Sequence, residues 1–143
     1  MKEVSNALRI GYISKLNGNV ILGGSPVPVY GRVVPASLEP PYIYFPSQSQ
    51  SDASPKDRFM SENTVNIEAV VKSIDGGNYH ELESICNQVK QLVCSFDAKD
   101  WPQASGFGTV NSWFVDDNEI TDWVDGKWVF RKVMRFENTV EQL

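Results

Sequence analysis

The chain has 143 residues, of which 41% are hydrophobic and 22% charged, and its formal net charge at pH 7 is -5. This length suits one domain with a buried core. The acidic balance argues against general affinity for nucleic acid, since phosphate binding depends on clustered lysine and arginine, and it does not favour anionic membranes. Glu3, Arg9 and Lys15 interrupt the apolar residues at the N-terminus, so we expect no signal peptide, and no segment approaches transmembrane length.

The first predicted element is a helix over residues 3–16. Val4, Leu8 and Tyr12 recur at the spacing that places apolar side chains on one face of a helix. Asn17-Gly18 is a typical helix end.

Residues 20–22 and 27–34 are short β-branched stretches broken by glycines and by Pro26 and Pro28, which predicts edge strands or an extended connection. Residues 35–41 predict a turn, and Tyr42 to Phe45 a compact strand. The polar serine, glutamine and proline stretch at 46–58 has little to bury, so we expect a mobile loop.

Residues 64–74 alternate between apolar and polar side chains and predict a strand with Val65, Ile67, Ala69 and Val71 on its buried face. After Asp75-Gly76-Gly77, the strongest signal of the chain is a helix over residues 78–95. Its apolar residues fall at the spacing of one helix face: Leu82, Ile85, Cys86, Val89, Leu92 and Val93. Asn78 is suited to the N-cap, with Glu81 reaching back as in a capping box.

In the last third, residues 109–115 predict a strand, residues 116–126 an acidic connection, and residues 127–137 the clearest strand of the chain. That strand places Trp128, Phe130, Met134 and Phe136 on one face and Arg131 and Arg135 on the other. The order predicts a single α+β domain over residues 1–143, with a mainly antiparallel sheet packed by an N-terminal helix and a central helix.

Catalytic or metal-binding groups do not converge in this pattern. His80 and Cys86 lie on different faces of the predicted helix, which favours a surface histidine and a small core residue over a thiol dyad. Cys86 and Cys94 stand roughly 12 Å apart along that helix, beyond disulfide reach, and are expected to be reduced. No nucleotide-binding, hydrolase or zinc motif is present, so we expect no enzymatic activity.

The acidic segment and the tryptophans remain to be explained. Measured from Asp116, Ile120 and Thr121 occupy positions where an EF-type calcium loop needs a ligand and a glycine, so a charged hairpin tip is favoured over a metal site. Trp113 and Trp128 are expected to be core residues. Trp123, within the acidic segment, is expected at an interface, where aromatic side chains bury area at low entropic cost.

Several features together resemble the tail-completion or tail-terminator proteins of long-tailed bacteriophages. The resemblance covers nearly the whole chain and rests on the order and length of its elements. They are the N-terminal helix, Pro40-Pro41-Tyr42-Ile43-Tyr44-Phe45, the polar loop, the strand Asn66 to Val71, the capped helix after Gly76-Gly77 and the closing strand Trp128 to Phe136.

This resemblance implies a small α+β subunit that assembles into a hexameric ring. The ring would cap the tail tube, stop its polymerisation and provide the surface for head joining. The implied partners are further copies of the chain, the tail tube protein and head–tail connector proteins, with no cofactor, membrane or sequence-specific nucleic acid. The implied location is the tail or neck of a virion assembled in the host cytoplasm.

Under this hypothesis the 47–59 loop and the acidic 116–125 hairpin are docking elements ordered on contact, and Arg131 and Arg135 pair with acidic residues of a neighbouring subunit. The candidate interface residues are Ser47, Gln48, Lys56, Arg58, Phe59, Asp116, Asp117, Glu119, Asp122, Trp123, Asp125, Arg131 and Arg135. Two alternatives stay open. One is another neck protein, a head-closure or minor tail component, and the other is a small enzyme or ligand-binding domain whose pocket uses Tyr42, Tyr44 and Trp128.

Overall fold

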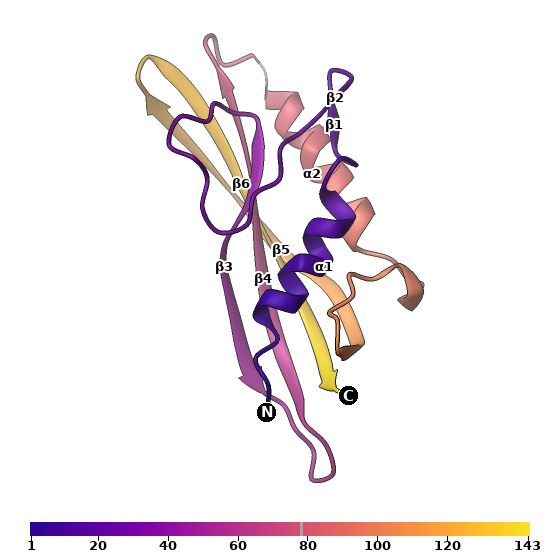
Figure 1. The fold of residues 1–143 in the computed structure, drawn as a ribbon. Coiled ribbons are helices and arrows are strands. Elements are labelled where there is room, and N and C mark those ends of the chain that lie inside the picture. The colour runs from indigo at the N-terminus through magenta and orange to yellow at the C-terminus, as the bar shows by residue number, and fades with distance from the viewer. Residues whose placement is uncertain (78) are drawn as a thin grey trace.

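A computed structural model describes residues 1–77 and 79–143, and it has a four-stranded antiparallel sheet in the order β3-β4-β6-β5. The strands are β3 (Tyr42–Asp52), β4 (Met60–Ser73), β5 (Phe107–Val124) and β6 (Lys127–Gln142). Two helices, α1 (Ser5–Leu16) and α2 (Tyr79–Val93), lie on one side of this sheet (Figure 1). The predicted α+β class and antiparallel sheet are therefore confirmed.

The core lies between the two helices and the face of the sheet that they cover, which we call the helix face. α1 contributes Leu8, Tyr12 and Leu16, all fully buried. The sheet contributes the alternate residues predicted for β4 together with Phe130, Met134 and Phe136 of β6. The opposite face, which we call the open face, is not covered by either helix (Figure 1).

The structure confirms the apolar pattern predicted for the central helix α2. The residues of this pattern that are buried are Leu82, Ile85, Cys86, Val89 and Val93. The 3.6-residue repeat places them on one stripe against β4 and β6. The prediction of an N-cap at Asn78, and of the capping box that depends on it, falls outside the described residues.

The polar stretch after Phe45 was expected to be a loop, but β3 continues through it to Asp52, and only residues 53–59 form the connection to β4. A register shift after Tyr44 turns Gln48 and Gln50 towards α1. The Gln48 side chain accepts from Arg9 Nη1 at 2.7 Å and donates to the Ser5 carbonyl at 2.9 Å. The Gln50 side chain accepts from the Val4 amide. Polar residues therefore serve as strand residues here, because their amide groups bind the first turns of the helix.

The acidic stretch 116–124 was expected to be a connection, but it is the second half of β5, and only Asp125 and Gly126 form the turn to β6. Both turn residues have positive φ, of 50° and 77°, which suits a two-residue hairpin turn. The acidic side chains are accommodated because the paired strand β6 supplies cations directly across from them. The matching cross-strand pairs are Asp116 with Arg135 and Glu119 with Lys132.

The segment between α1 and β3 is mostly extended, as predicted. It contains the two-residue strands β1 (Ile21–Leu22) and β2 (Ser25–Pro26). Residues 28–31 then run along the outer edge of β3: Tyr30 donates to the Ile43 carbonyl, Ile43 to Pro28 and Phe45 to Gly31. The predicted turn at 35–41 contains a cis Pro40-Pro41 bond.

The two hairpins of the four-stranded sheet, β3–β4 and β5–β6, point to opposite ends of that sheet. In Figure 1 the β3–β4 tip extends past both chain termini, and the β5–β6 tip lies at the other end. β6 has 16 residues, and a strand of that length spans roughly 50 Å. The two tips are therefore separate surfaces.

Candidate interaction surfaces

The first candidate surface is the β3–β4 tip, residues 53–59. Lys56 and Arg58 are exposed, and Phe59 is half exposed although it is aromatic. Arg58 lies 3.6 Å from Glu141 of β6. The other two predicted residues of this group lie on β3 and not on the tip. Ser47 accepts from Asn66 on the open face, and Gln48 is bound to α1. The predicted group is thus divided into an exposed tip and a strand that packs within the chain.

The second candidate surface is the acidic half of β5. Four of its carboxylates form ion pairs inside the chain: Asp116 with Arg135, Asp117 with Lys90 of α2, Glu119 with Lys132, and Asp122 with Arg131. Hydrogen bonding from Tyr79, and then from Lys132, lowers the pKa of Glu119. Much of the acidic charge is therefore balanced by neighbouring strands and helix, and Asp125 is left at the exposed turn.

Aromatic side chains mark the β5–β6 tip. Trp123 is 57% exposed and stacks edge to face on its cross-strand partner Trp128, with ring centroids 4.8 Å apart. Trp123 is thus exposed, as an interface residue must be. The prediction that Trp128 is a core residue was wrong, because at this end β6 extends beyond the start of α2 and the indole is 38% exposed. Trp113 is only half-buried, at the opposite half of β5.

Arg131 and Arg135 lie on the open face, as the alternation of β6 predicted, but both are already paired within the chain. Arg131 lies 3.2 Å from Glu68, whose side chain is only 8% exposed, and 3.4 Å from Asp122. Burial, with the hydrogen bond to Glu68, raises the pKa of Tyr44 to about 12. Arg131 therefore belongs to a network across all four strands, and pairing of Arg131 or Arg135 with a neighbouring subunit stays a prediction.

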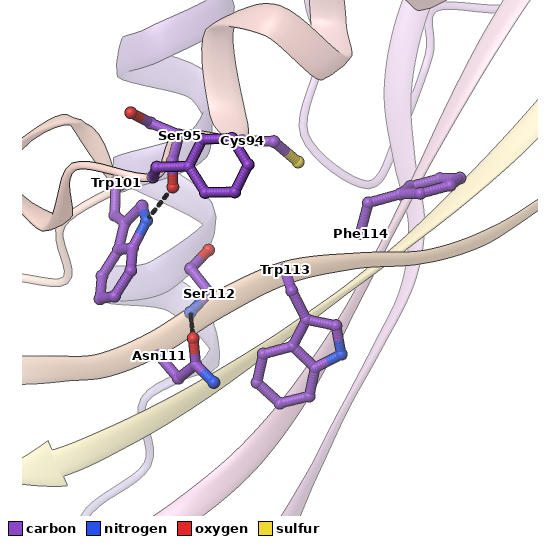
Figure 2. Close-up of a pocket in the computed structure, with 8 residues that line it drawn as sticks. Cys94, Ser95, Trp101, Asn111, Ser112, Trp113 and Phe114 are labelled. Carbon is purple, nitrogen blue, oxygen red and sulfur yellow. Dashed lines mark hydrogen bonds between the residues drawn. The ribbon is translucent and has the colours of Figure 1, made fainter.

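A groove of about 400 Å³ lies beside β5. Its lining residues come from the segment after α2 and from the middle of β5: Cys94, Ser95, Phe96, Trp101, Asn111, Ser112, Trp113 and Phe114 (Figure 2). Side chains from both faces of β5 line it, because Ser112 is buried on the helix face while Trp113 pairs with Glu137 on the open face. The groove therefore lies at the free edge of the sheet, and we call it the edge groove.

The edge groove has one wall fixed by hydrogen bonding and another by packing. Trp101 Nε1 donates to the Ser95 carbonyl at 2.7 Å, which holds the indole against the loop (Figure 2). Phe114 packs on Phe136 and lies 4.4 Å from Lys90 Nζ. Sequence reasoning missed this surface, although four of its members are aromatic, because nothing in the sequence indicates that residues 94–101 face residues 111–114.

The structure does not bring His80 and the two cysteines together into a reactive site. Burial raises the pKa of the Cys86 thiol to about 11 and also raises that of Cys94. His80 is exposed. Within residues 1–77 and 79–143, no three side chains of the metal-binding types gather around one point, and no helix there is long and apolar enough to cross a membrane.

The alternative ligand pocket of Tyr42, Tyr44 and Trp128 does not form. Tyr42 and Tyr44 pair with Val70 and Glu68 on the open face. Trp128 lies opposite Ser73, whose side chain belongs to the helix face. The sheet therefore separates the two tyrosines from the tryptophan.

These features define a two-layer α+β domain whose distinctive side chains lie at two hairpin tips and one sheet edge. The fold is similar to that of a chain in a solved structure titled "Virion of native gene transfer agent (GTA) particle", with a TM-score of 0.75 and 19% identity over 99% of both chains. This similarity establishes a shared fold over the full length. No family model and no curated protein sequence matches the chain.

Proposed function

We propose that this chain is a structural component of a phage-like virion, acting as a tail terminator. In this role it forms a ring, hexameric in the family that the sequence resembles, which caps the tail tube, stops its polymerisation and offers a surface for head joining. The observation that carries the proposal is the match over 99% of both chains to a chain from a virion particle.

The distribution of side chains supports assembly by surface contact. The β3–β4 tip presents Phe59 directly after the charged residues Asp57 and Arg58, and the β5–β6 tip presents Trp123. Aromatic anchors bordered by charged residues are typical of protein interfaces. Because the two tips lie at opposite ends of the sheet (Figure 1), a ring of such subunits can contact the tail tube with one end and a connector protein with the other. The proposed activity is binding, without catalysis.

A second candidate is another neck component, such as a head-closure or minor tail protein, since the shared fold supports a virion role without specifying the position. The two roles predict different particles when the gene is deleted. Loss of a terminator gives overlong or headless tails. Loss of a head-closure protein gives tails of normal length beside heads that leak or remain unjoined.

The test is negative-stain microscopy of particles made without this chain, with the chain restored from a plasmid as the control. Tails of irregular, increased length that return to normal on restoration support the terminator. Normal virions in its absence contradict any essential neck role, and unjoined tails of normal length favour the second candidate.

A further inference from the structure

We propose that the edge groove binds a second copy of this chain, through the segment that borders β3 at the opposite edge of the sheet. This inference rests on the proposed ring and specifies the contact that builds it. The occupant is the exposed pair Arg32-Val33, which follows the residues bound along the outer edge of β3. We call these two residues the β3-edge ridge.

Both side chains of the ridge are exposed and available to a partner. Val33 is 81% exposed, which is high for an aliphatic side chain, and Arg32 is also exposed. The preceding hydrogen bonds from Tyr30 to Ile43 and from Phe45 to Gly31 hold the backbone against β3, so the ridge is anchored. An anchored insert loses little conformational entropy on binding.

The groove has the matching character. Phe96, at its rim, is fully exposed, and Trp101 and Trp113 make its walls apolar. A volume of about 400 Å³ falls within the range of sites that enclose several side-chain groups. An exposed phenylalanine beside an apolar hollow is the arrangement expected where a partner supplies the missing contacts.

The charges of the two edges are complementary. Most carboxylates of residues 94–125 are paired within the chain: Asp116, Asp117, Glu119 and Asp122 with cations of β6 and α2, and Asp97 with Lys99. Within the described residues, neither Arg32 nor Asp100, which precedes the groove residue Trp101, forms an ion pair, since neither takes part in any salt bridge there. The Arg32 guanidinium of one copy therefore suits the Asp100 carboxylate beside the groove of another.

The position of the two surfaces determines the kind of assembly. β3 and β5 are opposite edges of one sheet, so ridge and groove are different patches and their contact is heterologous. A heterologous contact repeated with a closing rotation produces a ring. Each subunit then donates its ridge to one neighbour and its groove to the other, and both hairpin tips remain available for other virion proteins.

The experiment uses two variants of the full chain with substitutions at exposed positions. The ridge variant carries Arg32→Glu and Val33→Asp, and the groove variant carries Phe96→Asp. Analytical ultracentrifugation of wild type up to millimolar concentration is expected to give closed oligomers, and each variant alone is expected to be monomeric, with at least a tenfold weaker self-association. Ile74→Asp, at another strongly exposed aliphatic, is the matched control and should assemble as wild type.

The decisive measurement is an equimolar mixture of the two variants. One intact ridge and one intact groove remain between them, so the mixture should form a dimer and stop there. Wild type that stays monomeric at millimolar concentration, a groove variant that still assembles, or a mixture that gives no dimer would overturn the inference. Normal virions without the gene, together with ring formation in solution, would instead contradict the proposed function and leave the contact standing.

Discussion

Asn138 of β6 donates from Nδ2 to the hydroxyl of Tyr12 on α1 at 2.6 Å, and the two residues are 126 positions apart in the sequence. Both are fully buried. The bond crosses from sheet to helix within the core and joins the last strand to the first helix. It thereby fixes how α1 lies on the sheet, which in turn places the β3 residues that the helix binds.

Tyr12→Phe should destabilise the protein, because it removes the acceptor and leaves a buried amide donor unpaired. A buried polar group without its partner costs about 1–3 kcal/mol. The free energy of unfolding from urea titration measures the effect. Tyr42→Phe on the open face is the control and should change it by less than about 0.5 kcal/mol. Equal losses in the two variants would show that the Tyr12 hydroxyl contributes no specific stabilisation.

The same residue predicts an alkaline instability. Burial raises the pKa of Tyr12 to about 12 from 10.0, so folding favours the neutral phenol. Its contribution is fully present below the unfolded pKa, near pH 10, and is lost as the pH rises towards 12, at up to about 1.4 kcal/mol per pH unit. The free energy of unfolding of wild type should therefore fall more between about pH 10 and pH 12 than that of Tyr12→Phe. An identical fall in both proteins would contradict this assignment.

Arg131 and Arg135 lie two residues apart on the open face and should respond very differently to alanine. Arg131→Ala leaves the nearly buried Glu68 carboxylate without its cation, and we expect a loss of about 1–3 kcal/mol, below the range for fully buried pairs because Arg131 is partly exposed. Arg135→Ala breaks an exposed pair with Asp116 and should cost about 0–1 kcal/mol.

Thermal or urea unfolding of the two arginine variants provides the comparison, and each is the internal control for the other. A double-mutant cycle with Glu68→Gln isolates the Arg131–Glu68 coupling. If Arg135→Ala proved the more damaging substitution, the exposed pair and not the buried one would be the structural contact.

Gly11→Ala should destabilise the chain although alanine is the better helix former. An added Cβ would lie 2.2 Å from the carbonyl oxygen of Gln103 and 3.0 Å from its backbone nitrogen, so the loop before β5 would have to move. We expect the steric clash to lower the free energy of unfolding by more than the gain of about 1 kcal/mol from helix propensity, which leaves a net loss of about 1–3 kcal/mol. Ser14→Ala, at an exposed position of the same helix, is the control and should be neutral or slightly stabilising.

The sequence was sufficient where one element carries its own periodic signal. The 3.6-residue repeat of α2 and the alternation of β4 and β6 place their core residues correctly, with the exception of Trp128 at the start of β6. It was insufficient where an element depends on a distant partner. The strand character of Gln48 requires the first turn of α1, and that of Asp116 requires Arg135 across the β6 register. No pattern local to either segment contains this information, so both were interpreted as loops.

The candidate interface also could be predicted only in part, because local sequence patterns do not show contacts between distant segments. Exposure of Trp123 and Phe59 could be anticipated from their acidic or polar surroundings, and both are exposed. The edge groove could not be anticipated in this way. It forms only when the segment after α2 folds back beside β5, which brings Trp101 and Trp113 to the same groove.

Trp123→Ala should leave the fold intact and impair head joining. The side chain is mostly exposed and its main contact is the edge-to-face pair with Trp128, so its removal should cost about 0.5–1.5 kcal/mol. Circular dichroism and urea titration check the fold, and the ratio of joined particles to free tails in negative stain checks the function. Ile74→Asp again serves as the exposed control. A collapsed fold would show that Trp123 stabilises the domain itself, and a normal yield of joined particles would exclude the β5–β6 tip as the joining surface.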